Sequence, residues 1–269
     1  MGRTVRIATF NILHGRSLDD DRVDVDRLAA AVKALDADVL GLQEVDRDQP
    51  RSMNADLTAV AAEAMGAVDS QFVAALSGTP GGTWMAATGE EQPGSASYGI
   101  ALLSRLPVVS WRVVRLPALP SRVPVWFRGD RLPKVVGDEP RVAVAAVLEG
   151  PHGHLTVANT HLSFVPGWNV LQLRRLMRSL AGTREPLVVM GDLNMEPRQA
   201  ARVSGLRPLA SAATFPAEAP TRQLDHLLAR GPVTAEGPAE AVRLPLSDHR
   251  ALAVDCRVRG TGPTGRARM

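Results

Sequence analysis

Residues 186–197, PLVVMGDLNMEP, constrain the fold more strongly than any other part of the chain. The apolar run 187–190 is typical of a buried strand. It leads directly into Gly191-Asp192-Leu193-Asn194, which places a carboxylate and a carboxamide at the end of a rigid element. Side chains alternate along a strand, so Asp192 and Asn194 are expected on one side if the strand continues that far. Taken alone, the segment fits a simple polar turn equally well.

Five further apolar segments carry polar residues of the same few types. They are residues 6–13 (RIATFNIL), 37–45 (ADVLGLQEV), 155–163 (LTVANTHLS), 223–228 (QLDHLL) and 246–252 (LSDHRAL). Each reads as a strand that delivers an acid, an amide or an imidazole. Core packing gives no reason for this repetition. The pattern therefore indicates a polar site assembled from several strand ends.

The blocks FNIL, LQEV, NTHLS, GDLN, LDHLL and SDHRAL resemble, in type and order, those of the endonuclease/exonuclease/phosphatase family, the superfamily of deoxyribonuclease I. They extend over nearly the whole chain. The resemblance implies a four-layer α/β/β/α sandwich, in which two packed, mainly antiparallel sheets are flanked by helices. Periodicity alone predicts strands that outnumber helices in two packed sheets, and does not separate this fold from other α/β folds.

Helical spacing of apolar residues predicts helices over residues 25–35, 54–65 and 169–180, with Asp24 placed to cap the first. Residues 78–97, 116–140 and 208–220 are rich in small residues and proline and are expected to be loops. We expect one domain over residues 1–259. The Gly-, Thr- and Arg-rich residues 260–269 are expected to form a disordered tail.

Composition excludes several classes of protein. No run of about 18 apolar residues is present, so no integral membrane segment is predicted. The single cysteine, Cys256, excludes an internal disulfide and a cysteine zinc cluster. A strand is predicted from the first residues, which leaves no room for a signal peptide, and a cytoplasmic location is expected.

The charge balance gives weak guidance on the substrate. The formal net charge is only +3 although the pI is about 9.7, and aromatic residues make up 4% of the chain. Few aromatic side chains are therefore available to stack on the bases of a single strand. The composition favours an ordinary solvated surface over a dedicated nucleic-acid face.

The resemblance implies a divalent-metal site. Glu44 corresponds to the principal carboxylate ligand, Asn11 lies beside it, and Asp248 is a second carboxylate near the metal. Carboxylate and amide oxygens are hard donors that suit Mg²⁺ or Mn²⁺. We therefore expect Mg²⁺ or Mn²⁺ as the cofactor.

The resemblance also implies a set of catalytic residues. Asp192 corresponds to the residue that orients and deprotonates the attacking water, and Asn194 to one that holds a phosphoryl oxygen. His249 matches the histidine that donates a hydrogen bond to the developing charge. Asp225 is expected to orient His249 and raise its pKa, because a neighbouring carboxylate favours the protonated ring. His161 matches the family's second histidine.

Three residues are expected to contact the substrate phosphate: Asn159, Arg141 and Tyr98. In some nucleases a carboxylate near the position of Tyr98 partners the histidine that corresponds to His161. Tyr98 stands there in this chain, so His161 is predicted to lack a carboxylate partner. The remaining histidines are predicted to be turn or surface residues. They are His14, His152, His154 and His226.

The leading prediction is a metal-dependent phosphoric ester hydrolase, a nuclease or phosphodiesterase acting on DNA or RNA. A small-molecule or lipid-headgroup phosphoesterase is the alternative, and a non-catalytic binding protein with the same fold is a minor one. Two segments, residues 115–141 and 162–169, combine arginines or aromatic residues and are expected to form a rim that selects the substrate.

Overall fold

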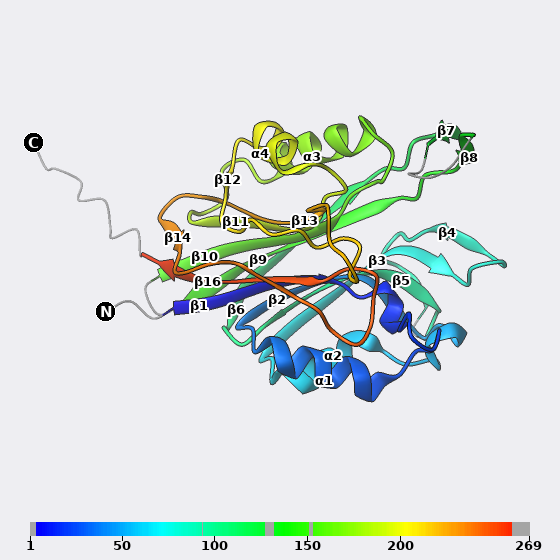
Figure 1. The fold of residues 1–269 in the computed structure, drawn as a ribbon, viewed down its shortest axis with the longest axis horizontal. Helices are drawn as coiled ribbons and strands as arrows, with labels where there is room; N and C mark the ends of the chain where they lie inside the picture. Colours follow the sequence, from blue (N-terminus) through cyan, green and yellow to red (C-terminus); the bar gives the residue numbers. More distant parts are fainter. Residues whose placement is uncertain (1–3, 93, 127–131, 151–152, 260–269) are drawn as a thin grey trace, which may run out of the picture.

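The protein is described by a computed structural model that covers residues 4–92, 94–126, 132–150 and 153–259. Two large β-sheets lie face to face, and helices cover the outer face of each sheet (Figure 1). The predicted tail, residues 260–269, and His152 lie outside the described residues. So do residues 127–131 of the expected rim.

The first sheet has eight strands and contains both the first and the last strand of the chain. Its strands follow the order β14-β16-β1-β2-β5-β3-β4, and β15 also pairs with β16. β1 and β2 are parallel, whereas their other neighbours are antiparallel. The strands are β1 (Thr4–Asn11), β2 (Val39–Arg47), β3 (Asp69–Gly78), β4 (Trp84–Ala86), β5 (Ser97–Ser104), β14 (Val233–Ala235), β15 (Glu240–Val242) and β16 (Ala251–Val258).

The second sheet has six strands in the order β12-β13-β11-β10-β9-β6. Here β10 and β11 are the parallel pair. A separate two-stranded ribbon joins β7 to β8. The strands are β6 (Val108–Leu116), β9 (Arg141–Gly150), β10 (Gly153–His161), β11 (Leu187–Asp192), β12 (Arg207–Pro208) and β13 (Asp225–Arg230), with β7 (Val123–Val125) and β8 (Lys134–Val136) in the ribbon.

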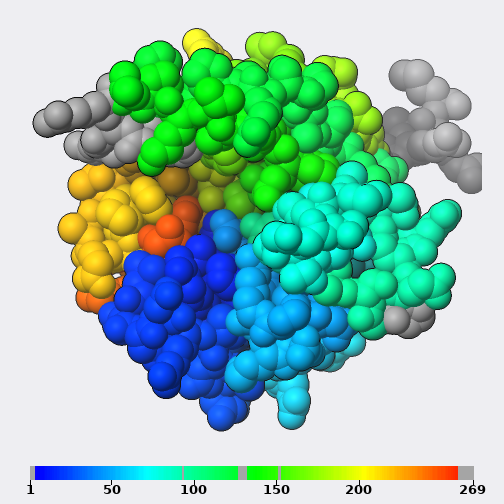
Figure 2. All heavy atoms as spheres, turned by 90° about the vertical axis from the view of Figure 1, so that its right-hand side faces the viewer, coloured from blue at the N-terminus to red at the C-terminus, as the bar shows by residue number. Residues whose placement is uncertain are grey.

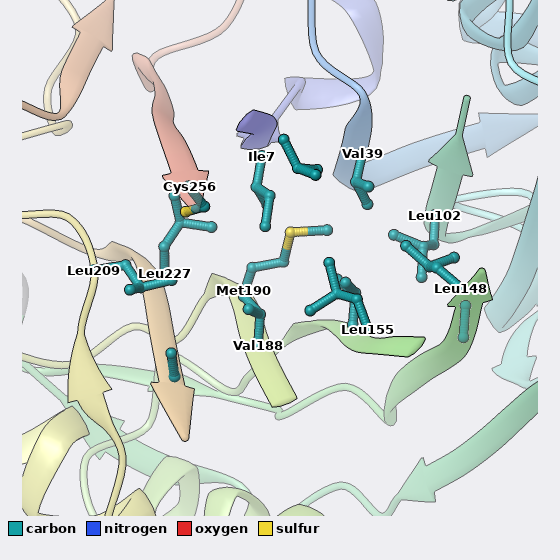
Figure 3. Close-up of a cluster of buried hydrophobic side chains, with 14 of the residues drawn as sticks. Ile7, Val39, Leu102, Leu148, Leu155, Val188, Met190, Leu209, Leu227 and Cys256 are labelled. Atoms are coloured by element: carbon teal, nitrogen blue, oxygen red, sulfur yellow. The ribbon is translucent and has the colours of Figure 1, made fainter. Parts of the chain in front are cut away.

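The main core lies between the two sheets (Figure 3). Ile7, Val39 and Leu102 of the first sheet face Val188 and Met190 of the second, and all five are buried. Separate apolar clusters join the first sheet to α1 and α2 and the second sheet to α3 and α4. The four-layer α/β/β/α sandwich implied by the sequence is therefore confirmed.

Three of the helices agree with the sequence prediction and one was missed. α1 spans Val25–Leu35, and the Asp24 side chain accepts hydrogen bonds from the amides of Asp26 and Arg27 as expected. α2 spans Leu57–Met65 and begins later than predicted because Asp56, not Asn54, caps it. α3 spans Trp168–Ser179. The eight-residue α4, Pro197–Ser204, has a single buried residue, Ala200, and so gave little periodic signal.

Two of the expected loops contain short strands. Residues 78–97 include β4, and residues 116–140 include the β7–β8 ribbon, which stands above the sandwich at one end (Figure 1). One-turn 3-10 helices follow β1 and β2, at Leu13–Gly15 and Pro50–Ser52. In the described part of the chain, no helix combines the length and the apolar character needed to cross a bilayer.

Candidate active site

The polar strand ends predicted from sequence meet at one end of the sandwich. Carboxyl ends of parallel strands lie at the same edge of a sheet, so Asn11 and Gln43 are paired in one sheet and His161 and Asp192 in the other. The antiparallel β13 begins at this edge, where Asp225 pairs with Asp192. Figure 2 faces this end, where blue N-terminal atoms, orange atoms of the C-terminal part and green atoms of the middle of the chain meet near the centre.

A β-bulge sets the position of Glu44. The register between β2 and β5 shifts between Gln43 and Val45, and Glu44 has a φ of 56°, in the left-handed region. Its Oε1 accepts a hydrogen bond from Nδ2 of Asn11 at 3.0 Å. Burial raises the pKa of Glu44, and the hydrogen bond from Asn11 and the charge of Arg141 partly oppose this. The bulge therefore turns a half-buried carboxylate towards Asn11.

Asp192 occupies the centre of the cluster. Its Oδ2 accepts a hydrogen bond from Nδ2 of Asn11 at 3.2 Å and lies 3.6 Å from Nε2 of His161 and 3.8 Å from Nε2 of His249. Its Oδ1 accepts the backbone amide of Asn194 at 3.0 Å. Burial raises the pKa of Asp192 to about 7, although the positive charge of His249 opposes the shift. A carboxyl group with such a pKa can exchange protons near neutral pH.

His249 is held by a buried carboxylate. Its Nδ1 donates to Oδ2 of Asp225 at 2.9 Å, and the same oxygen accepts the Thr214 hydroxyl at 2.6 Å. Burial lowers the pKa of His249, but the attraction and hydrogen bond of Asp225 outweigh it and raise the pKa to about 10. The ring is therefore a cation at neutral pH, and its Nε2–H faces Asp192.

His161 has the opposite electrostatic environment. Burial and the nearby charge of Arg141 lower its pKa well below the ordinary value, so the ring is neutral. Nη1 of Arg141 donates to Nδ1 of His161 at 3.3 Å. Because a guanidinium can only donate, Nδ1 must accept, and the ring proton lies on Nε2. His161 was expected to lack a carboxylate partner. Its Nδ1 is contacted by an arginine, whereas the Asp192 carboxylate lies 3.6 Å from its Nε2.

The turn after β11 differs from the sequence expectation. β11 ends at Asp192, and Asn194 has a φ of 50°, so the strand does not continue and strand alternation does not align the two side chains. The Asn194 side chain instead donates to the carbonyl of Leu162 at 3.1 Å, and its Nδ2 lies 3.4 Å from Nε2 of His161. Two nitrogens that both carry protons cannot bond to each other. The N–H groups of Asn194 Nδ2 and His161 Nε2 are therefore two hydrogen-bond donors side by side.

Asn159 is not available to a phosphate. Its Nδ2 donates to the carbonyls of Leu42 and Ala101 at 2.9 and 2.8 Å, and its Oδ1 accepts Nε2 of Gln43 at 2.6 Å. The side chain is fully buried and joins the two sheets. The expectation that Asn159 contacts a phosphate is therefore wrong. Asn159 lies two residues before His161 on β10, where the opposite sheet covers it, and its role is structural.

The other two expected phosphate contacts, Arg141 and Tyr98, are buried near Glu44, and so is part of the expected metal residue Asp248. Arg141 is 5% exposed, and its Nε is buried without a hydrogen-bond partner among the described residues. Tyr98 is also buried, and burial followed by the charge of Glu44 raises its pKa well above 10. Asp248 is half-buried, and its charge helps to raise the pKa of Glu44. All three therefore surround Glu44 from different strands or loops.

Some residues that build the site were missed from sequence. Ser247, with a φ of 72°, donates its hydroxyl to the carbonyl of Asn11 at 2.6 Å and accepts the amide of His249 at 3.0 Å. It thereby ties the loop before β16 to β1. His226 was predicted to be a turn or surface residue, but it is buried on β13, and its Nε2 lies 2.9 Å from the carbonyl of Met195. Alternation along LDHLL, with Asp225 facing the site, was the available signal.

Two donor sets could hold a divalent cation. The first combines the carboxylates of Glu44 and Asp248, which are hard oxygen donors, with Asn11, whose Nδ2 donates to Glu44 and whose Oδ1 accepts the amide of Leu13. The second is the buried group of Asp192, Asp225 and His249, whose ligand atoms lie within 4.8 Å of one another. In the second group the His249 ring is protonated and already bonded to Asp225, which leaves no nitrogen lone pair. The first set fits a hard cation better.

The sequence matches the endonuclease/exonuclease/phosphatase family over residues 8–249. The chain belongs to this family. The resemblance predicted from the six sequence blocks is therefore confirmed, and the matched residues extend from β1 to His249. No curated protein matches the chain in sequence.

Solved structures show the same fold. An endonuclease/exonuclease/phosphatase from Beutenbergia cavernae is 25% identical with a TM-score of 0.66, and the match covers 96% of this chain and 72% of that one. The catalytic domain of human Nocturnin, with a bound sulfate, is 20% identical with a TM-score of 0.62, and 95% of each chain is covered. A mannosyl-6-phosphatase from Bacteroides thetaiotaomicron is 17% identical with a TM-score of 0.59, covering 94% and 99%. The last two structures are less than 25% identical to this chain and show the shared fold.

Proposed function

We propose that this protein is a divalent-metal-dependent hydrolase of phosphate esters, with a nucleic-acid-type phosphodiester as its main substrate. The observation that carries the proposal is the environment of Asp192. Its carboxylate lies between a neutral imidazole, His161, and a cationic imidazole, His249, with Nε2 distances of 3.6 and 3.8 Å. One acidic group is thus poised to take a proton, while the cation beside it can stabilise negative charge.

Asp192 is proposed as the general base. It would orient a water molecule and take its proton as the water attacks phosphorus, and its pKa of about 7 suits that exchange. His249, held by Asp225 and Thr214, would donate from Nε2 to the negative charge that develops on the phosphoryl group. Asp225 acts through His249 and is a positioning residue.

The adjacent donors Nε2 of His161 and Nδ2 of Asn194 are proposed to bind a phosphoryl oxygen. They lie 3.4 Å apart and cannot satisfy each other, so an acceptor between them would bond to both. Arg141 would contribute its positive charge from the floor of the site, and Tyr98 would border the phosphate from β5. This arrangement recognises the tetrahedral anion irrespective of the groups esterified to it.

Glu44, Asn11 and Asp248 are proposed to hold Mg²⁺ or Mn²⁺. When bound, such a cation neutralises charge on the phosphate and its leaving oxygen. Burial raises the pKa of Glu44 more than the hydrogen bond from Asn11 and the charge of Arg141 lower it, so the protein compensates the negative charge of this carboxylate only in part. A bound cation would compensate the rest of this charge. Asn11 donates to both Glu44 and Asp192 and would hold the metal ligand and the general base in fixed positions relative to each other.

A small-molecule or lipid-headgroup phosphoesterase is the second candidate. The modest net charge of +3 and the 4% aromatic content favour a compact substrate over a long polyanion. The mannosyl-6-phosphatase with this fold shows that the fold also supports cleavage of a sugar phosphate. The residues described above would contact only a phosphoryl group and therefore would not discriminate between these substrates.

A panel assay tests the proposal. The protein is incubated with Mg²⁺ or Mn²⁺ and with plasmid, abasic duplex, single-stranded DNA and RNA, bis-p-nitrophenyl phosphate, sugar phosphates and phospholipid vesicles. Cleavage of a nucleic-acid phosphodiester that EDTA abolishes supports the main assignment. Turnover restricted to sugar phosphates or phospholipids would transfer the assignment to the second candidate, and no metal-dependent turnover on any of them would contradict both.

A further inference from the structure

The two helices that cover the second sheet carry exposed arginines and no acidic residues. α3 and α4 contain no aspartate or glutamate but contribute five exposed arginines. These are Arg174, Arg175, Arg178, Arg198 and Arg202, and none makes a side-chain hydrogen bond or ion pair with another described residue. By contrast, arginines elsewhere, such as Arg27 and Arg230, are paired with carboxylates.

A groove with a volume of about 490 Å³ lies along one side of α3. Trp168, Leu171, Arg175 and Arg178 line it from the helix, and Pro117 lines it from the segment after β6. The Leu171 side chain is 47% exposed. The groove thus combines an apolar wall near the beginning of the helix with two arginines further along the same helix.

Hydrogen bonds connect this groove to the candidate active site. Gln172 accepts the amide of Ser163 at 2.8 Å, two residues after His161, and donates to the carbonyl of Pro117 at 3.1 Å. Asn169, in the first turn of α3, donates to the carbonyl of Asn194 at 2.8 Å. α3 therefore starts beside the proposed phosphate site and leads away from it (Figure 1).

We propose that the groove along α3 binds an unpaired nucleic-acid strand next to the catalytic centre, with Arg175 and Arg178 on its phosphates and Trp168 and Leu171 against a base. The inference rests on the proposed function in its nucleic-acid form. From Asn169 to Arg178 the helix rises roughly 14 Å, which is long enough for a short stretch of strand.

The shape and chemistry of the groove favour a strand over a duplex. An apolar wall can receive the face of an unstacked base, whereas paired bases expose only their edges. Arg175 and Arg178 are three residues apart and lie on neighbouring positions of one helix face, so both can reach a single backbone. The absence of carboxylates from α3 removes competing partners for these arginines.

The test compares two double variants in the full chain. Arg175→Gln with Arg178→Gln removes the groove charges, and Arg198→Gln with Arg202→Gln removes two arginines of α4, which are also exposed, as a matched control. Binding of fluorescein-labelled 20-nucleotide DNA and RNA strands is measured by anisotropy in EDTA, at several salt concentrations. Hydrolysis of bis-p-nitrophenyl phosphate with Mg²⁺ or Mn²⁺ reports on the catalytic centre independently.

The groove variant should bind strands at least about tenfold more weakly, and the slope of log affinity against log salt should fall by about 1.4 if two phosphate contacts are lost. The α4 control should bind like wild type, and both should retain wild-type turnover of the small diester. If strand binding weakened equally in the two variants, the inference would be overturned, because non-specific electrostatic attraction would then explain the binding. The inference would also be overturned if poly-glutamate displaced the labelled strand as well as an unlabelled strand does. Binding of the wild type to anionic vesicles and not to strands would overturn it too.

The two proposals fail in different ways. Hydrolysis of the small diester without any strand binding would leave a phosphoesterase and refute the groove. Strand binding that depends on Arg175 and Arg178, without metal-dependent hydrolysis of any diester, would support the groove and contradict the proposed catalysis.

Discussion

Nδ1 of His249 lies 2.9 Å from Oδ2 of Asp225, and both side chains are buried. The contact joins residues from β13 and from the loop before β16, which belong to different sheets. The Thr214 hydroxyl bonds to the same carboxylate oxygen at 2.6 Å and fixes its direction. The ring can therefore present only Nε2 to Asp192, which is the orientation that the proposed catalysis requires.

Asp225→Asn should lower kcat by at least about 10²-fold, because the ring loses the charge that keeps it protonated. The pKa of His249, raised to about 10 in the wild type, should move towards its ordinary value of 6.5. NMR titration of the ring in metal-free protein measures this directly. Thr214→Val keeps the carboxylate and should have the smaller effect on both quantities. An unchanged ring titration in Asp225→Asn would show that the pair does not control His249.

Asp192→Asn and His249→Ala should each lower kcat by at least about 10²-fold, the usual scale for loss of a general base or of a donor to developing charge. Both residues lie at the end of the sandwich and not in its apolar core, so thermal unfolding should remain cooperative. Single-turnover kinetics on the substrate found in the panel assay measure the effect. Retention of more than half of wild-type turnover would remove the role assigned to that residue.

Glu44→Gln should raise the metal concentration needed for half-maximal activity, because the substitution keeps the shape but removes the negative charge that a hard cation requires. The wild type should lose activity in EDTA and regain it with Mg²⁺ or Mn²⁺. Calorimetric titration of each metal into both proteins provides a readout independent of turnover. Full activity in EDTA would rule out the metal mechanism.

Gly41→Ala should destabilise the protein by about 1–3 kcal/mol, the usual range for an overpacked core. A Cβ at this position would lie 2.8 Å from the Asn159 side chain and 2.8 Å from Cε of Met190. Asn159 cannot retreat without breaking its hydrogen bonds to the opposite sheet. Urea unfolding measures the change. Gly137→Ala is the matched control, since a Cβ there would meet nothing within 4 Å and should leave the stability unchanged or slightly higher.

His226→Gln should reduce the loss of stability in acid. Burial lowers the pKa of His226, and the bond to the carbonyl of Met195 only partly opposes this. The folded state therefore binds this proton less readily than the unfolded chain, whose histidines titrate near 6.5. The free energy of unfolding must fall as the pH drops below about 6.5, towards the lower value of the folded state. Glutamine can still donate to Met195 but does not titrate.

Urea unfolding at pH 7.5 and 5.5 measures this difference in wild type and variant. The variant should show the smaller decrease between the two pH values. His14 and His161, whose pKa values are also lowered, contribute in both proteins and cancel in the comparison. An equal decrease in both proteins would show that the His226 proton does not couple to folding.

The sequence predicted the fold wherever apolar runs had a clear period. The strands around Asn11, His161 and Asp192 and the capped helix after Asp24 agree with the structure. Short elements such as α4 and β4 have too few buried residues to create a pattern. The order of the strands within each sheet could not be predicted by periodicity, because pairing depends on contacts between distant segments.

The candidate site was predictable in its residue types but less so in its side-chain directions. Asn159 and His161 share one side of β10, yet the first is covered by the opposite sheet and the second reaches the edge. Asn194 reaches His161 through a backbone turn that no strand pattern contains. The partners Thr214 and Ser247 lie in irregular segments, where only the folded chain brings them to Asp225 and Asn11.

The pairing of β1 with β16 has a consequence for how activity develops in a refolding chain. Thr9 on the first strand lies opposite Leu252 on the last, and the cluster that includes Asn11 and His249 depends on that closure. These segments are more than two hundred residues apart in sequence. Pairing them costs a large loop-closure entropy, so we expect this pairing to form late in folding. Catalysis should therefore appear only with the final kinetic phase, and a fragment that lacks either end should be inert even if its helices form.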